Sequence, residues 1–157
     1  MKVNNIKILN LFKKKQDTVC SCCGESYDDF SVAYNEPNYD LHLDNKMSMK
    51  GEDFCIMDGE YYFIRCILEI PIINHTHPFT WGVWVSQSKT NFEIYKDNFK
   101  KDTKDRHTFG YLSNELNEYS GSQGLHAQVC FQNDGNRPKV ILEEAENQLY
   151  TFNSFER

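Results

Sequence analysis

The clearest alternation of apolar and polar positions lies in residues 61 to 72, YYFIRCILEIPI. Aromatic and β-branched residues dominate this stretch and Pro71 ends it, which is typical of a β-strand. Successive strand residues face opposite sides, so one face is almost wholly apolar and the other is mixed. The apolar face, which is predicted to be core, comprises Tyr62, Ile64, Cys66, Leu68 and Ile70.

A second strand is predicted over residues 81 to 88, WGVWVSQS, after a turn through NHTHPFT. The short connection favours antiparallel pairing between residues 61 to 70 and residues 81 to 87. Alternation places Trp81 and Val83 on the core side and turns Trp84 toward the mixed, half-exposed face. Ile64, Leu68 and Val83 are therefore expected to be buried together.

After this strand the apolar residues recur at every third or fourth position instead of every second. Phe92, Tyr95 and Phe99 fall at i, i+3 and i+7, the apolar stripe of an amphipathic helix. Thr90 and Glu93 have the T-x-x-E spacing of a capping box, so the helix is expected to begin there.

A second hairpin is predicted toward the C-terminus, where LHAQVCFQ and PKVILEE flank the Asp134–Gly135 turn signal. Residues 30 to 50 are turn-rich, contain Pro37 and are expected to lack regular structure. The elements together predict an α+β fold: one antiparallel sheet with one or two helices in a single domain. We assign this domain to residues 18–157 and an N-terminal segment to residues 1–17.

Length and charge restrict the function classes. The 157 residues suit one domain, and a formal net charge of −6 argues against nucleic-acid binding, which relies on Lys and Arg, while permitting a basic protein partner. The N-terminus lacks a secretory signal, and no apolar run of about 18 residues could span a membrane. The sequence therefore predicts a cytoplasmic protein whose six cysteines are thiols or metal ligands.

Cys20 and Cys23 form a C-x-x-C-G motif, a spacing that lets two thiolates bind one zinc ion. Zinc is thus the one cofactor that the sequence suggests. Cys55 is the first choice for a third ligand because it lies outside the predicted strand, and the fourth is unassigned among the histidines and other cysteines. Plain reduced thiols are the open alternative. A redox role is disfavoured because the acidic residues after the motif raise a thiol pKa.

No motif of a hydrolase, nucleotide-binding loop or zinc protease is present. The candidate binding surface is instead the mixed sheet face, where Arg65, Glu69 and Trp84 could combine charge with an aromatic anchor. The alternative is that Arg65 and Glu69 only keep an outer face soluble.

The leading hypothesis is a small cytoplasmic binding or interaction protein without catalysis, in which a zinc knuckle would be structural. One alternative is an immunity-type protein that neutralises a basic toxin, suggested by small size and acidity. Another is a metal-dependent enzyme acting on a small molecule, with Cys20, Cys23 and a histidine holding the metal.

The segments CSCCG, DFCIMDGEYYFIRCILEIPI, PFTWGVWVS, FGYLSNEL and NQLYTFNSFER resemble, in this order, the bacterial family called domain of unknown function 2199. The family pattern has C-x-x-C-G, a cysteine at Cys55 and a G-x-R-P turn at residues 135–138. It has no counterpart of the His75 and His77 pair, and it usually has glycine where Cys66 stands. The resemblance implies a single bacterial domain and brings no activity with it.

Overall fold

The structure is a computed structural model that describes residues 18–19, 26–27, 31–38, 47–71, 77–101, 106–116 and 119–143. The chain divides into two compact units, Met1–Phe30 and Ser31–Arg157. In the first unit, β1 (Thr18–Val19) and β2 (Ser26–Tyr27) form an antiparallel pair. The expected domain boundary between residues 17 and 18 stays a prediction.

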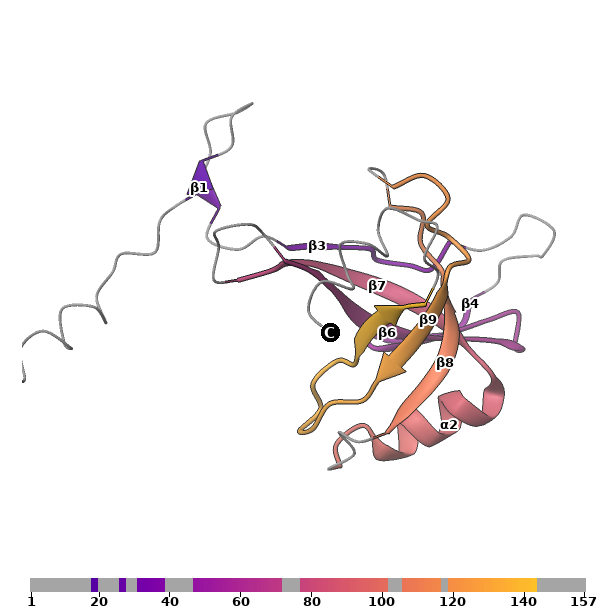
Figure 1. The fold of residues 1–157 in the computed structure, drawn as a ribbon. Helices are drawn as coiled ribbons and strands as arrows, with labels where there is room; N and C mark the ends of the chain where they lie inside the picture. The colour runs from indigo at the N-terminus through magenta and orange to yellow at the C-terminus, as the bar shows by residue number, and fades with distance from the viewer. Residues whose placement is uncertain are drawn as a thin grey trace, which may run out of the picture. The chain divides into compact units, whose positions relative to one another are not determined.

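The second unit is built on one eight-stranded sheet (Figure 1). Its elements are β3 (Ser31–Ala33), β4 (Met47–Lys50), β5 (Phe54–Met57), β6 (Tyr61–Ile70), β7 (Phe79–Gln87), α2 (Lys89–Asn98), β8 (His107–Leu112), β9 (His126–Cys130) and β10 (Lys139–Leu142). The stretch expected to lack regular structure thus supplies β3 and β4, and that prediction was wrong.

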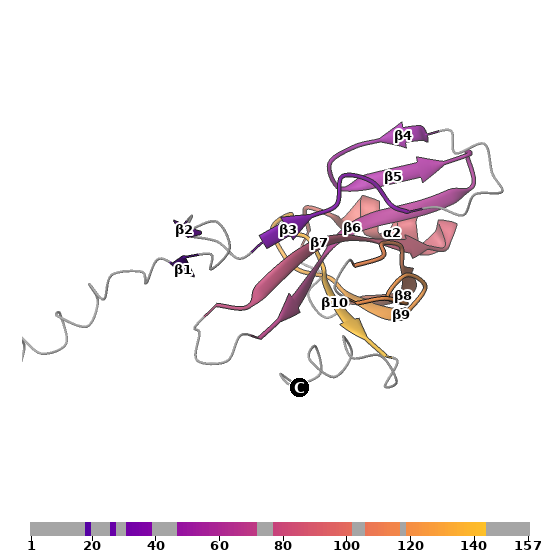
Figure 2. The ribbon, with the colours of Figure 1, turned by 90° about the horizontal axis from the view of Figure 1, so that it is seen from above.

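Strands β6 to β10 close into a five-stranded barrel. Each pairs antiparallel with the next, and β10 returns to pair with β6. Because a meander of five strands ends on a strand that runs with the first, this closing pair is parallel. Figure 2 shows the strands curling around, with β5 and β4 continuing the sheet beyond β6.

The predicted α+β fold is therefore wrong: the described part of the protein is mostly β, with α2 as its one helix. The sequence predicted β6, β7, β9 and β10 as strands, but the alternation of side chains is the same in an open sheet and in a closed barrel. The helix is an insertion between β7 and β8, and it does not form a separate layer.

A backbone hydrogen bond and an ion pair join β6 to β10 at the closing seam. Ile67 N donates to the Pro138 carbonyl at 2.8 Å, and Lys139 Nζ lies 2.7 Å from Glu69 Oε2. Arg137 Nε, from the same turn, lies 2.7 Å from Asp53 Oδ1 before β5. The G-x-R-P turn therefore supports barrel closure.

The pairing of β6 with β7 confirms the first sequence prediction. The strands are antiparallel, with Ile64 opposite Val85 and Leu68 opposite Trp81. Ile64, Leu68 and Val83 have no exposed surface. The apolar face of β6 thus lines the barrel interior, as its alternation indicated.

A second, smaller apolar cluster covers the mixed face of β6 and β7. It consists of Cys55, Met57, Phe63 and Trp84, with Tyr34 packed against it. The Trp84 indole is 1% exposed, and its Nε1 donates to the Tyr34 carbonyl at 3.0 Å. Sequence reasoning put Trp84 on the correct face but expected it to be half-exposed, because it did not foresee that the chain after β3 would cover that face.

Helix α2 presents the predicted stripe to the barrel, with Phe92 and Tyr95 buried and Phe99 packed against the core. The predicted capping box at Thr90 was wrong. Ser88 is the N-cap, and its Oγ accepts from Asn91 N at 3.1 Å, because the helix begins directly after β7. None of the helical structure in the described residues has the length and apolar character that crossing a membrane requires.

Two Asp–Gly pairs make the tight turns of the sheet. The predicted one has φ of 60° at Asp134 and 73° at Gly135, and it joins β9 to β10. The other, Asp58–Gly59, was not predicted; it has φ of 50° and 74° and joins β5 to β6. Positive φ at both residues is typical of type I′ hairpin turns, which favour this dipeptide.

Asn114 bridges the gap along β7 where pairing passes from β3 to β8. The side chain is fully buried. Its Oδ1 accepts from Trp84 N at 2.7 Å, and its Nδ2 donates to the Glu36 carbonyl at 2.9 Å. One amide therefore satisfies two backbone groups that no strand reaches.

We expect Asn114→Ala to lower the free energy of unfolding by about 2–3 kcal/mol, because it leaves two buried backbone groups unpaired. Urea denaturation followed by circular dichroism measures the loss. Asn136→Ala is the control: this exposed side chain makes one hydrogen bond, to the Asn133 carbonyl, and should change stability by less than about 1 kcal/mol. Equal losses would contradict a bridging role for Asn114.

Candidate functional site

The three residues predicted to form a binding surface occupy one face of the sheet but do not form an open site. Arg65 lies opposite Trp84 in the β6–β7 register, with its guanidinium carbon 5.8 Å from the indole centroid. Glu69 lies further along β6 and pairs with Lys139 at the barrel seam. Trp84 is buried, so the structure joins Arg65 to Trp84 in a cation–π contact and leaves no exposed tryptophan anchor.

The surroundings of Arg65 disfavour its charge. Its pKa is lowered by burial and by repulsion from Arg137, while Asp53 and Glu52 act in the opposite direction. Its Nε is buried without a hydrogen-bond partner among the described residues. Arg65 is held by packing over Trp84, and this supports a structural role at least as well as a binding role.

Of the predicted zinc ligands, Cys20 and Cys23 lie outside the described residues. Cys55 is 1% exposed in an apolar cluster, and burial raises the pKa of its thiol to about 11. A zinc ligand is a thiolate, so this environment does not support Cys55 in that role. Within the described ranges, no group of three His, Cys, Asp or Glu side chains could hold a metal ion.

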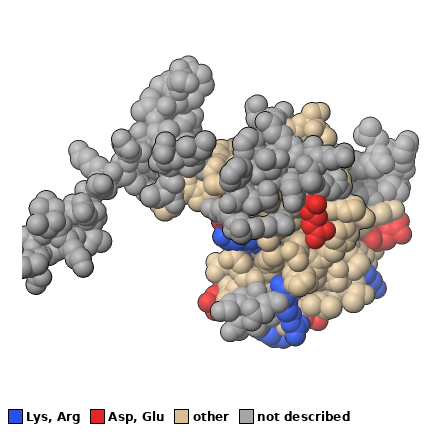
Figure 3. Space-filling view, viewed as in Figure 1, with Lys and Arg blue, Asp and Glu red and all other residues tan. Residues whose placement is uncertain are grey.

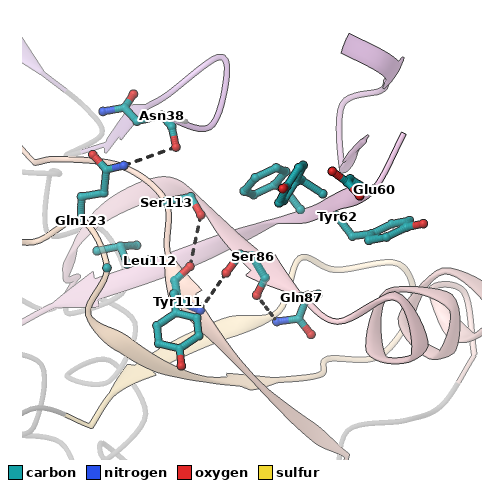
Figure 4. Close-up of a pocket in the computed structure, with 12 residues that line it drawn as sticks. Asn38, Glu60, Tyr62, Ser86, Gln87, Tyr111, Leu112, Ser113 and Gln123 are labelled. Atoms are coloured by element: carbon teal, nitrogen blue, oxygen red, sulfur yellow. Dashed lines mark hydrogen bonds between the residues drawn. The ribbon is translucent and has the colours of Figure 1, made fainter. Parts of the chain in front are cut away.

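A pocket of about 270 Å³ opens where β6, β7 and β8 meet the loop before β9 (Figure 4). We call it the tyrosine pocket. Its lining consists of Asn38, Glu60, Tyr61, Tyr62, Phe63, Ser86, Gln87, Tyr111, Leu112, Ser113, Gln123 and Gly124.

Backbone pairing fixes the walls of the tyrosine pocket. Tyr111 N donates to Ser86 Oγ at 3.2 Å, and Ser113 Oγ donates to the Tyr111 carbonyl at 3.2 Å. On the far wall, Gln123 Nε2 points at the Asn38 carbonyl, 3.5 Å away (Figure 4). Both serine hydroxyls therefore contact the backbone of β8, and no hydrogen bond found among the described residues joins either one to a histidine or a carboxylate.

The β5–β6 turn brings a negative charge to the pocket. Glu60 directly follows the Asp58–Gly59 turn, and its backbone N donates to the Met57 carbonyl at 3.2 Å. Among the described lining residues Glu60 alone carries a charge. Its carboxylate is exposed and makes no ion pair or hydrogen bond with any described side chain. Figure 4 shows it beside Tyr62, across the pocket from Gln123.

Three exposed rings continue the site along the outer surface of β8 and β9. Phe109 is 42% exposed and Tyr111 is 44% exposed, and the exposed His126 faces Tyr111 in the β8–β9 register. The ring centroids lie 5.2 Å apart for Phe109 and Tyr111 and 4.9 Å apart for Tyr111 and His126. We call these residues the aromatic patch, and Tyr111 belongs both to it and to the tyrosine pocket.

The surface around the aromatic patch carries little charge. Figure 3 shows the region over β8 and β9 as largely uncharged, with Lys, Arg, Asp and Glu side chains at its margins. Exposed aromatic rings with few charges around them resemble the centre of a protein interface more than ordinary surface.

The loop that completes the pocket is held by Glu115. Its carboxylate accepts from Gly121 N at 2.6 Å and from Gln123 N at 2.8 Å. These backbone donors lower the pKa of Glu115. Because the folded pKa lies below the unfolded one, the ionised carboxylate stabilises the fold at neutral pH, and this contribution is lost as the pH falls through the folded pKa.

We expect Glu115→Gln to reduce the loss of stability on acidification, because the variant no longer has the carboxylate that must be protonated. The measurement compares urea midpoints of the two proteins from neutral pH down to about pH 3, below the usual range for glutamate. At neutral pH the variant should be the less stable protein. Parallel pH profiles would show that the Glu115 contacts do not stabilise the loop.

Sequence reasoning missed the tyrosine pocket and the aromatic patch. Two signals could have found parts of them. The missed Asp58–Gly59 turn puts Glu60 at a hairpin end, and the alternation in HTFGYL puts Phe109 and Tyr111 on the same face as His107, which is polar. Aromatic residues on the polar face of a strand are a signal of binding. The turn before Glu60 and the aromatic face of β8 come together only because the barrel places β8 near the start of β6.

A family model described as an uncharacterized protein conserved in bacteria, domain of unknown function 2199, matches residues 19–154. This match confirms the family resemblance drawn from the motifs. Neither a curated protein nor a solved structure matches the chain. The family description supplies no activity, so the function must be argued from the site.

Proposed function

The chain belongs to this bacterial family, and from that premise we propose that it is a binding protein without a catalytic step, which holds a segment of a partner protein. The observation that carries the proposal is the continuity of the aromatic patch with the tyrosine pocket through Tyr111. Exposed aromatic anchors beside a pocket are the usual basis of affinity in protein interfaces.

The chemistry of the pocket supports binding over catalysis. Its hydroxyl groups and amides hold the strands and the loop together, as the bonds of Ser86, Gln87 and Gln123 show. A nucleophile needs a base within hydrogen-bond reach, and the described residues around Ser86 and Ser113 supply none. The groups that can meet a ligand are ring faces, one carboxylate and amides.

We also propose that the protein acts in the cytoplasm. Cys55 and Cys66 are free thiols in the described part of the chain. Unpaired cysteines are typical of a reducing compartment, where disulfides are rare.

Selection from a displayed peptide library tests the binding proposal. Peptides of about ten residues, enough to cross the patch and the pocket, are selected on the wild-type protein and then measured against variants. We expect Phe109→Ala and Tyr111→Ala each to weaken binding at least about tenfold. Ile94→Ala, which removes an exposed apolar side chain from α2, should leave the affinity unchanged. Peptides that bind all variants equally, or no selected peptides, would refute the proposal.

A structural zinc ion held by Cys20 and Cys23 stays a separate proposal. It is supported by the C-x-x-C-G spacing and by the β1–β2 pair, in which Val19 lies opposite Ser26, because this pairing joins the residues on either side of the motif. The purified protein should then contain about one zinc per chain, and a chelator should lower its Tm.

The cysteine variants make this zinc proposal specific. Cys20→Ser and Cys23→Ser should each lose the metal, whereas Cys22→Ser should retain it. A metal-free protein whose Tm responds neither to chelator nor to added zinc would refute the proposal and leave reduced thiols as the explanation of the motif.

A further inference from the structure

We infer that the bound segment carries an arginine, whose guanidinium enters the tyrosine pocket and pairs with Glu60. The inference rests on the proposed function and adds the chemistry of the partner. It follows from three features of the pocket: the sign of its charge, the shape of its lining and the state of its hydrogen-bonding groups.

The charge of the pocket selects a cation. Glu60 is the one charged side chain among the described residues that line it, and its carboxylate meets no described cation. A phosphate or carboxylate ligand would therefore face repulsion, and the described lining residues offer no positive group to offset it. The formal charge of −6 on the whole chain acts in the same direction, because it attracts a basic partner over a longer range.

The lining favours a planar cation over a compact one. Tyr62 lies beside Glu60 at the start of β6, with its ring centroid 5.2 Å from that of Phe92, and Tyr111 lines the pocket from β8. A guanidinium stacks on aromatic faces and can give two parallel hydrogen bonds to one carboxylate. An ammonium group is more strongly hydrated and cannot form that two-bond geometry.

Most of the donors in the pocket are already used within the protein. Gln87 Nε2 donates to the carbonyls of Ser86 and Phe109, at 2.9 and 3.2 Å, and the Ser113 hydroxyl donates to the Tyr111 carbonyl. The Glu60 carboxylate remains as an acceptor without a described donor. A ligand that brings its own donors, as a guanidinium does, fits this arrangement.

The aromatic patch explains why the cation should belong to a protein segment. An arginine side chain in the pocket leaves the flanking residues of its chain over Phe109, Tyr111 and His126, where apolar side chains can pack. A single-stranded nucleic acid could also stack on these rings, but its phosphates would meet Glu60 and a surface with few described cations.

The test uses the peptides selected on the wild-type protein. Arginine should recur in them, and replacing it by citrulline, which keeps the shape and loses the charge, should weaken binding at least about tenfold in calorimetry. Replacement by lysine should weaken binding by a smaller factor.

The matching change in the protein is Glu60→Gln. It should lower the affinity for the arginine peptide about tenfold and should hardly change the affinity for the citrulline peptide. Glu93→Gln on α2 is the control: it removes an exposed carboxylate of the same type and should change nothing. Circular dichroism confirms that both variants fold. A double-mutant cycle that shows no coupling between Glu60 and the arginine would overturn the inference.

The other outcomes separate this inference from the proposed function. In one outcome the selected peptides depend on Tyr111 but lack arginine, and in another they bind Glu60→Gln as well as they bind wild type. Either result would overturn the inference that an arginine pairs with Glu60, and it would still agree with the proposed binding function. Peptides that ignore Tyr111 would overturn both. Binding of a single-stranded oligonucleotide that is lost in Tyr111→Ala would overturn the arginine and the protein partner together.

Discussion

Gly110→Ala is expected to cost about 4 kcal/mol or more of unfolding free energy, the largest effect of any substitution proposed for this protein. Gly110 lies in β8 where this strand crosses close to the end of β7. An added Cβ would fall on the Ser86 carbonyl oxygen and would lie 2.5 Å from Gln87 Nε2 and 2.7 Å from Val85 Cγ1. The first of these is a backbone atom of a paired strand, so relief requires β7 and β8 to separate.

The same region forms one wall of the tyrosine pocket, so the variant should also lose peptide binding. Urea denaturation measures the stability, and Gly51→Ala is the control. At Gly51 an added Cβ would lie 3.4 Å from its nearest neighbour, the Phe54 carbonyl oxygen, and the change should be within about 1 kcal/mol. A Gly110→Ala protein as stable as the control would show that the two strands do not approach as closely as described.

Leu68→Ala is expected to cost about 2–5 kcal/mol, because it removes buried apolar atoms and leaves a cavity in the barrel. Leu68 has no exposed surface and belongs to the main core cluster. Arg65→Ala, on the other face of the same strand, should cost only about 1 kcal/mol from the lost cation–π contact with Trp84.

The comparison between these two variants tests the assignment of the faces of β6. Thermal unfolding and urea titration should both show Leu68→Ala as the less stable of the two variants. The contrary result is that Arg65→Ala lowers the free energy of unfolding as much as Leu68→Ala does. In that case the seam and the cluster around Trp84 would stabilise the fold as much as the barrel interior.

The local elements of this protein could be read from its sequence. Alternation from Tyr61 to Ile70 identified β6 and its buried face, and the stripe of Phe92 and Tyr95 identified α2. The Asp134–Gly135 pair identified the last hairpin. These predictions succeeded because side-chain periodicity and turn chemistry are properties of a few neighbouring residues.

Barrel closure could not be read in this way. The parallel pairing of β10 with β6 joins Lys139 to Ile67, and nothing in the local pattern of either strand specifies it. The burial of Trp84 has the same origin, because the Tyr34 carbonyl that accepts its indole proton comes from a segment 50 positions away. A residue on the outer face of a strand is predicted to be exposed, because the local sequence does not show which distant segment covers that face.

The candidate site shows the same division. The sequence carries a turn signal at Asp58–Gly59, just before Glu60, and an alternation that puts Phe109 and Tyr111 on one strand face, although neither was predicted. Only the tertiary structure decided that these groups meet, because the end of β8 pairs with the end of β7 beside the start of β6. It also buries Trp84 under Arg65 and pairs Glu69 with Lys139, since long-range packing and not periodicity determines which outward side chains remain accessible.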